Sequence, residues 1–146
     1  MVTVGVLRER RRKVLEGGRT LIAIGPWVDV DLAASLTNSD MTIAGQTGAI
    51  EVMLPFAGDI VAITVRSSEA RTASTATFKI TKNGTALGSG AILDETNTSQ
   101  HKETFKEGQQ TFAADDRIGV QVTTPAAWTP TTADVAVMIY AVMAHQ

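Results

Sequence analysis

The sequence predicts an all-β fold, an antiparallel jelly-roll sandwich that follows an extended N-terminal arm. About nine short segments alternate apolar and polar residues at spacings of about 8 to 15 residues, and no segment has a convincing helical period. An Asn-Gly pair at residues 83–84 joins two of these segments, as in a two-residue hairpin. The long early loop and the meander-like second half favour a jelly roll among the antiparallel sandwiches and barrels.

Length and composition indicate an ordinary globular chain. Its 146 residues suit one domain with a sizeable core, and 44% of them are hydrophobic against 19% charged. Frequent alanine indicates close packing between sheets or subunits. The chain has no cysteine, which excludes disulfides and thiolate metal sites. It has no apolar run of about 18 residues and nothing like a signal peptide, so we expect neither a membrane-spanning nor an exported protein.

Charge is distributed unevenly along the chain. Residues 1–19 carry six basic and two acidic side chains, a net of +4, whereas the rest carries seven basic and thirteen acidic ones, a net of −6. A tail of one sign on a body of the other usually has its own role. We therefore divide the chain into a basic arm at residues 1–18 and a β domain at residues 19–146, with Gly17-Gly18 as a hinge.

The arm admits three interpretations. It could be a solvated terminal segment. It could bind nucleic acid through its arginines, although the body is acidic and no aromatic residue is interleaved to stack on bases. The favoured interpretation is a docking arm that orders on a protein partner, because apolar residues flank its charged centre. The residues assigned to docking are Val2, Val4, Val6, Leu7, Arg8, Arg10, Arg11, Arg12, Lys13, Val14 and Leu15.

The first half of the body contains strands separated by one long loop. Residues 20–24 and 27–32 read as strands on either side of a Gly25-Pro26 break, the second with Val28, Val30 and Leu32 on one face. Residues 33–48 are small and polar and predict a loop. A strand at residues 49–54 follows.

The clearest folding signal lies between residues 59 and 94. Residues 60–65 form a dense apolar run, typical of a central strand. Ala76, Phe78 and Ile80 alternate with polar residues before Asn83-Gly84, and residues 85–92 supply the second hairpin strand.

The second half continues with shorter strands. Residues 100–106 are highly charged and predict a weak edge strand, followed by a strand at 109–113. Residues 117–123 predict a strand with Ile118, Val120 and Val122 inward, and a Pro- and Thr-rich loop with Trp128 follows.

The last strand, at residues 134–144, is apolar on both faces. One face would meet its own domain, so the other needs a partner surface. We therefore predict that this strand helps to form a homotrimer. The residues assigned to the trimer interface are Val135, Val137, Met138, Ile139, Tyr140 and Val142.

Signals for catalysis are sparse, and we expect no enzyme, cofactor or metal. His101 and His145 have no adjacent nucleophile motif and no metal-site spacing. Asp115-Asp116 fits a turn better than a carboxylate pair. Residues 88–90, Gly-Ser-Gly, precede no helix and so form no phosphate loop. Trp27 and Trp128 could form a sugar-binding platform, but burial is the commoner fate of tryptophan.

The stretches AGDIVAITVRSSEARTASTATFKITKNGTAL, AADDRIGVQVTT and DVAVMIYAVM resemble the jelly-roll domains of tailed-phage virion proteins, and among these the small capsid decoration (cement) proteins. The resemblance covers roughly the last two thirds of the chain. It implies a trimer on the outer capsid that contacts the major capsid protein and neighbouring decoration subunits through its arm, made in the host cytoplasm, with no nucleic acid or membrane as partner. The same domain also occurs in fibres, so a trimeric receptor-binding or carbohydrate-binding head is the alternative.

Overall fold

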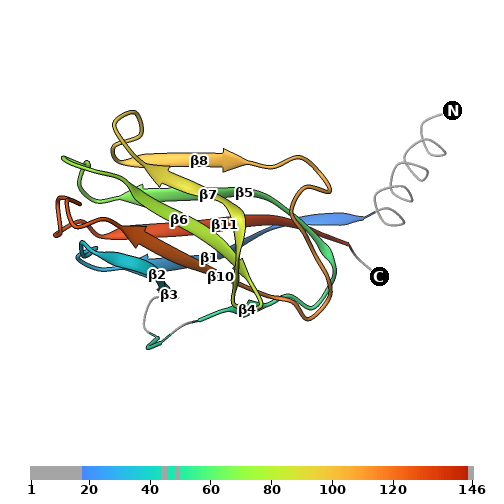
Figure 1. Cartoon of the computed structure of the whole chain (residues 1–146). Helices are drawn as coiled ribbons and strands as arrows, with labels where there is room; N and C mark the ends of the chain where they lie inside the picture. The colour runs from blue at the N-terminus through green and yellow to red at the C-terminus, as the bar shows by residue number, and fades with distance from the viewer. Residues whose placement is uncertain (1–17, 44–45, 49, 145–146) are drawn as a thin grey trace, which may run out of the picture.

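The computed structural model of the chain describes residues 18–43, 46–48 and 50–144, which contain strands and no helix (Figure 1). Its strands are β1 (Arg19–Asp29), β2 (Leu36–Asp40), β3 (Thr42–Ile43), β4 (Val52–Met53), β5 (Gly58–Ser67), β6 (Ala76–Lys82), β7 (Thr85–Leu93), β8 (Gln100–Thr104), β9 (Thr111–Phe112), β10 (Arg117–Thr124) and β11 (Val135–Ala144).

These strands form two antiparallel sheets packed as the layers of a sandwich (Figure 1). Sheet A has the order β3-β1-β11-β5-β8, with β9 also paired to β5. Sheet B has the order β2-β10-β6-β7, with β4 also paired to β10. Successive parts of the chain pass between the sheets, so strands distant in sequence, such as β1 and β11, are neighbours. This order is that of a jelly roll, as the sequence predicted.

The central hairpin is formed as predicted. Strands β6 and β7 pair directly, and Asn83 and Gly84 have φ values of 52° and 81°, as a type I′ turn requires. The Asn83 side chain accepts a hydrogen bond from the Arg117 N–H at 2.9 Å and donates to Asp116 Oδ1 at 2.8 Å. The turn therefore also joins the hairpin to the start of β10.

Two β-bulges change which side chains face the core. Residues 19–29 form one strand, so the predicted break at Gly25-Pro26 is wrong, although the register against β11 shifts between Ile24 and Trp27. After the shift Trp27 faces the core and is buried, whereas Val30 is 68% exposed and Leu32, beyond the end of β1, is buried again. A second shift in β5 turns both Ile60 and Ile63 inward.

The predicted loop at residues 33–48 is also wrong, because it contains β2 and β3. Both are short, and β2, which is mostly polar, forms the edge of sheet B and pairs with β10. Leu36 of β2 and Ile43 of β3 pack against the core, but one apolar residue in each strand makes no periodic pattern, and backbone pairing with β10 and β1 defines these strands. A sequence pattern based on hydrophobic alternation cannot detect such strands.

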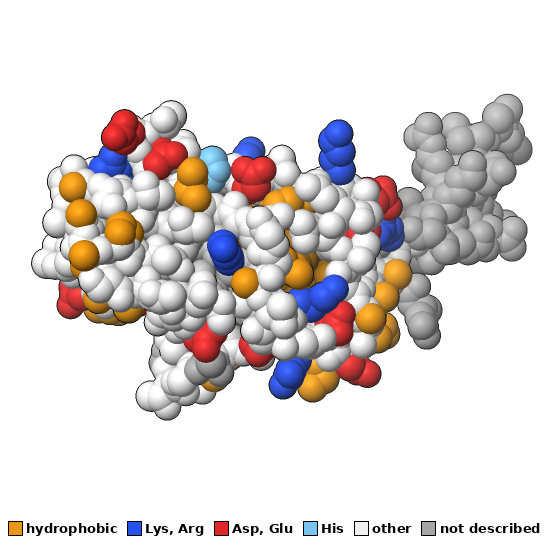
Figure 2. Space-filling model, viewed as in Figure 1, with side chains coloured by type: hydrophobic (Ala, Val, Ile, Leu, Met, Phe, Trp, Pro, Cys, Tyr) orange, Lys and Arg blue, Asp and Glu red, His pale blue; other side chains and the backbone are white. Residues whose placement is uncertain are grey.

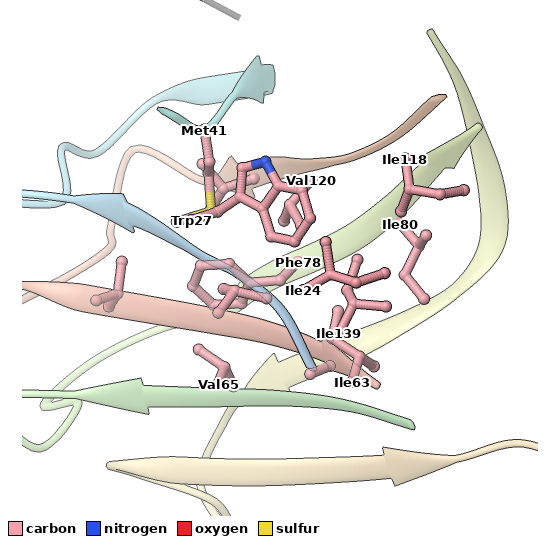
Figure 3. Close-up of a cluster of buried hydrophobic side chains, with 14 of the residues drawn as sticks. Ile24, Trp27, Met41, Ile63, Val65, Phe78, Ile80, Ile118, Val120 and Ile139 are labelled. Atoms are coloured by element: carbon pink, nitrogen blue, oxygen red, sulfur yellow. The ribbon is translucent and has the colours of Figure 1, made fainter. Parts of the chain in front are cut away.

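The core lies between the sheets (Figure 3). Trp27 packs in it beside Met41, and Phe78 and Val120 of sheet B belong to the same buried cluster as Ile24 and Ile139 of sheet A (Figure 3). Both tryptophans are buried with their indole N–H groups satisfied: Trp27 donates to the Ile50 carbonyl at 2.8 Å and Trp128 to the Leu32 carbonyl at 3.0 Å. The polar tip of each large ring is thus paired inside the fold.

Candidate interaction surface

Strand β11 lies between β1 and β5 in sheet A and presents two different faces. Val135, Val137, Ile139 and Ala141 are buried against sheet B. The alternate side chains Ala136, Met138, Tyr140 and Val142 point outward and are only half-buried. The strand is therefore covered on one side by its own domain and open on the other.

The neighbouring strands extend this open side. In the ladder, Leu21 of β1 lies opposite Val142, and Tyr140 lies between Ala23 of β1 and Ala62 of β5. Leu21 is 64% exposed. Both flanking alanines have short side chains, and Tyr140 is half-buried. We call this set the apolar face; it consists of Leu21, Ala23, Ala62, Met138, Tyr140 and Val142.

A charged cluster borders the apolar face near the start of β1. The Arg19 guanidinium donates hydrogen bonds to Asp59 and to Glu107, and these partners raise the pKa of Arg19. Asp59 is only 6% exposed and also accepts a hydrogen bond from the Gly108 N–H at 3.2 Å. The first residue of the body is thus fastened to β5 and to the loop before β9.

The outward side chains of sheet B are more polar. Thr77 and Lys79 of β6 alternate with the buried Phe78 and Ile80, and Gln121 of β10 lies opposite Lys79. On the side turned to the viewer, Figure 2 shows charged side chains of both signs scattered among other residues, without a patch of a single sign. Among the described residues, the apolar face of sheet A is therefore the better candidate for contact with another protein.

Two surface hollows lie at the opposite end of sheet A from Arg19. One, of about 510 Å³, is lined by residues that include Val28, Asp29, Arg66 and Asp134. The other, of about 480 Å³, is lined by residues that include Arg66, His101 and Lys102. Arg66 lines both. No carboxylate lines the second hollow.

The structure separates the residues that the sequence assigned to the trimer interface. Met138, Tyr140 and Val142 lie on the apolar face, where a partner could reach them. Val135, Val137 and Ile139 are at most 2% exposed inside the sandwich, so their assignment to an interface is corrected to the core. Sequence reasoning missed Leu21, Ala23 and Ala62, because only the pairing of β1 and β5 with β11 brings them together.

All the residues assigned to the docking arm lie outside the described part of the chain. The proposed boundary at residues 18 and 19 falls where β1 begins at Arg19. His145 also lies outside the described residues.

The catalytic alternatives considered from the sequence have ordinary structural roles. Asp115 has a φ of 69° and Asp116 accepts the Ala113 N–H at 2.8 Å, as in a turn. His101 Nε2 lies 3.6 Å from Glu103 Oε2 on the edge strand β8. The buried indoles of Trp27 and Trp128 cannot form a platform for sugars. In the described part of the chain no three His, Cys, Asp or Glu side chains gather as metal ligands, and no helix is long and apolar enough to cross a membrane.

Comparison with known proteins adds little. No protein-family model and no curated protein matches the chain. Among solved structures, a chain in the acidic stable capsid structure of Helicobacter pylori bacteriophage KHP30 is similar at 12% identity, with a TM-score of 0.38, over 88% of this chain and 98% of that chain. A likeness of this degree establishes neither a shared family nor a shared role.

Proposed function

We propose that this protein is a structural component of a phage virion that binds the outer surface of the capsid as a homotrimer and stabilises the shell. The observation that carries the proposal is the apolar face, an open side of a central strand with Tyr140 in its middle. A contact surface of this kind suits a protein whose role is assembly. The jelly-roll order of the strands and the resemblance of the sequence to decoration proteins support the same role.

The trimer would be formed by the apolar face. Edge strands could associate by extending their ladders, but β8 carries Lys102 and Glu103, charges that oppose edge pairing. The apolar face instead offers aromatic and methionine side chains, which are enriched in protein interfaces. Burying Leu21 and Tyr140 between copies would remove apolar surface from water without disturbing either sheet.

The shell would be stabilised by mass action. A ligand that binds only one state stabilises it by RT ln(1 + [L]/Kd), so a trimer that binds only the assembled shell opposes its separation under internal pressure. Three arms on one trimer make each later contact intramolecular, and avidity can then exceed the affinity of one arm by about 10²–10⁴. The arms begin beside Arg19, whose contacts with Asp59 and Glu107 fasten the end of β1 from which they leave.

Co-sedimentation with mature capsids tests this function directly. We expect the purified full-length protein to bind shells and to raise the temperature or the internal pressure at which they rupture. Light scattering of the unbound protein should give the mass of a trimer at micromolar concentration. Failure to bind shells, together with binding to host cells or glycans, would favour the trimeric fibre or carbohydrate-binding head instead.

That alternative would place the ligand at the ends of the sandwich. The hollow that contains Asp29, Arg66 and Asp134 is the described feature that favours it, since polar groups converge there on an aliphatic floor. It contains no aromatic side chain on which a sugar could stack. We therefore rank capsid binding first.

A further inference from the structure

We propose that Asn83 is a deamidation site of this chain and that the contact of its side chain with Asp116 holds the reaction back in the folded protein. The reaction is spontaneous and needs no enzyme. It does not depend on a role in a virion, so its absence would leave the proposed function standing.

The sequence supplies one position at which this reaction is chemically easy. In deamidation the backbone nitrogen of the following residue attacks the side-chain carbonyl carbon of asparagine, and a side chain on that following residue hinders the approach. The chain has three asparagines, at positions 38, 83 and 97, which are followed by serine, glycine and threonine respectively. Asn83 therefore has the unhindered nucleophile. Both Asn83 and Gly84 are exposed, so water reaches them.

The reaction exchanges an amide for an acid. The Gly84 nitrogen forms a bond to Cγ of Asn83, and the bond between Cγ and Nδ2 breaks. The proton of the Gly84 N–H passes to Nδ2, which departs as ammonia, and a succinimide ring remains. Water then opens the ring at either carbonyl and gives aspartate or isoaspartate. The sum is an amide and water converted to an acid and ammonia, with no oxidation or reduction.

The backbone of the folded turn opposes the attack. Asn83 occupies the first central position of the type I′ turn, with a φ of 52°. Such a position has a ψ of about +30°. At that ψ the Cβ of Asn83 and the nitrogen of Gly84 lie on nearly opposite sides of the Cα–C bond. Ring closure needs them on the same side, so the turn must open before the reaction can occur.

The side chain of Asn83 is fixed as well. Its Oδ1 accepts the Arg117 N–H at 2.9 Å, and its Nδ2 donates to Asp116 Oδ1 at 2.8 Å. Asp116 Oδ2 accepts the Ala113 N–H at 2.8 Å, so the carboxylate is itself anchored. Both polar ends of the carboxamide are thus bound at the start of β10, and these bonds must break before Cγ can turn to Gly84. The bond to the carboxylate is the stronger one, because one partner is ionised.

Deamidation would turn this contact into a repulsive one. An aspartate product would place a carboxylate oxygen where the amide donor of Asn83 now lies, against Asp116, and like charges at that distance repel. An isoaspartate product would also lengthen the backbone of the turn. Either product should separate the β6–β7 turn from the start of β10, so the modified chain should have a lower urea midpoint than the unmodified one.

Mass spectrometry of peptides from aged full-length protein measures amide and acid at each asparagine. In protein unfolded in urea at neutral pH, Asn83 should convert faster than Asn38 or Asn97. In the folded wild type, conversion at Asn83 should be at least about tenfold slower than in the unfolded chain, because a reaction through a locally opened state follows the population of that state.

Variants separate the Asp116 contact from stability in general. Asp116→Ala removes the acceptor and should raise the rate at Asn83 in the folded protein about tenfold, as expected for loss of one charge-assisted hydrogen bond. Asp115→Asn removes the neighbouring charge, leaves that hydrogen bond in place and is the matched control, with no change expected. Trp128→Phe lowers global stability beyond the opposite end of β10, where the indole donates to the Leu32 carbonyl, and should not accelerate the reaction.

Urea denaturation confirms that each variant is folded. Should Asp116→Ala fail to fold, Asp116→Asn keeps an acceptor oxygen without the charge and should still raise the rate, by a smaller factor. A folded Asp116 variant that deamidates at the wild-type rate would overturn the protective contact. So would a Trp128→Phe variant that is accelerated as much, since deamidation would then follow global unfolding. Equal rates in folded and unfolded wild type would remove the protection, and an unfolded chain in which Asn83 is no faster than Asn97 would remove the site.

Discussion

Two buried indoles show how single side chains fasten the ends of the sandwich. Trp27 lies in sheet A, yet its Nε1 donates to the Ile50 carbonyl in the segment before β4. We expect Trp27→Phe to lower the free energy of unfolding by about 2–3 kcal/mol, since it leaves a cavity and an unpaired carbonyl. Urea denaturation measures the effect. Phe56→Leu is the control: Phe56 is 41% exposed, and its replacement should change stability by less than about 0.5 kcal/mol. Equal losses in the two variants would contradict this role for Trp27.

Asp116 should make stability depend on acid pH. The hydrogen bond from Asn83 and then that from the Ala113 N–H hold the pKa of Asp116 below its ordinary value. A depressed folded-state pKa means that the charged form stabilises the fold above about pH 4, and that this contribution is lost as the pH falls through the folded pKa. Asp116→Asn should therefore be less stable than wild type at pH near 6, and the difference should narrow below about pH 3.

Urea midpoints at several pH values measure this difference. The contribution of Asp94 to stability should also be lost as the pH falls, because the backbone N–H groups of Asn97 and Thr96 lower its pKa. Asp29 should affect the pH dependence of stability in the opposite direction, since burial raises its pKa. The comparison of Asp116→Asn with wild type cancels both contributions. A difference that stays constant from pH 6 to pH 2 would show that the Asp116 charge has no role in stability.

At the scale of elements, the β6–β7 hairpin depends on close backbone contact. A Cβ atom built at Gly90 would lie 1.8 Å from the Phe78 carbonyl oxygen, whereas one at Gly88 in the same strand would meet nothing within 4 Å. We expect Gly90→Ala to cost about 2–3 kcal/mol or more of stability, because the two strands must separate to admit the methyl group. Gly88→Ala is the matched control and should be neutral or stabilising by a few tenths of a kcal/mol. Thermal unfolding of the two variants measures this difference in stability. Equal melting temperatures would contradict the close backbone contact between Gly90 and Phe78.

Elements with a strong local signal were predictable from the sequence. The type I′ turn at Asn83-Gly84 and the inward side of β10, with Ile118, Val120 and Val122, follow from turn chemistry and period-two alternation, and the structure confirms both. The inward side of β1 did not follow, because one extra residue at the bulge before Trp27 reverses the alternation. Strand β2 did not follow either, because pairing with β10 and not side-chain pattern defines it.

At the scale of the whole molecule, the candidate interaction surface was only half predictable. The sequence identified the last strand as apolar on both sides, but it could not decide which side meets the core. The packing of sheet A on sheet B decides which side is inward: Ile139 is buried between the sheets, and Tyr140 points to the outer side of sheet A. We therefore expect Tyr140→Asp to dissociate the proposed trimer while the protein stays folded, whereas Ile139→Asp should unfold the protein by burying a charge. Light scattering with urea denaturation separates the outcomes, and a trimer unaffected by Tyr140→Asp would move the interface elsewhere.

Deleting residues 1–18 should separate folding from attachment. The body begins its first strand at Arg19, and the described jelly roll is complete without the arm. The deletion variant should therefore keep its melting temperature and its trimer mass and lose stable binding to shells. Misfolding would mean that the arm is a structural part of the body. Unchanged binding to shells would place the docking surface on the jelly roll.

The salt dependence of binding would show whether the arm binds phosphates or docks on a protein. If its five basic residues at positions 8 and 10–13 bound phosphates, affinity for duplex DNA would fall with salt at a slope near −0.9 per contact, or about −4.5 for five. If the arm docks in a protein groove, its apolar residues should matter as much as its charges, because desolvated anchors usually dominate interface energy.

We would compare two full-length variants, one with the five basic residues changed to Gln and one with Val2, Val4, Val6 and Leu15 changed to Ser. Both should lose the shell, and neither they nor the parent should bind DNA appreciably at physiological salt. Tight, salt-steep DNA binding by the parent that survives the apolar substitutions would overturn capsid docking by the arm, because the charges would then act on phosphates alone.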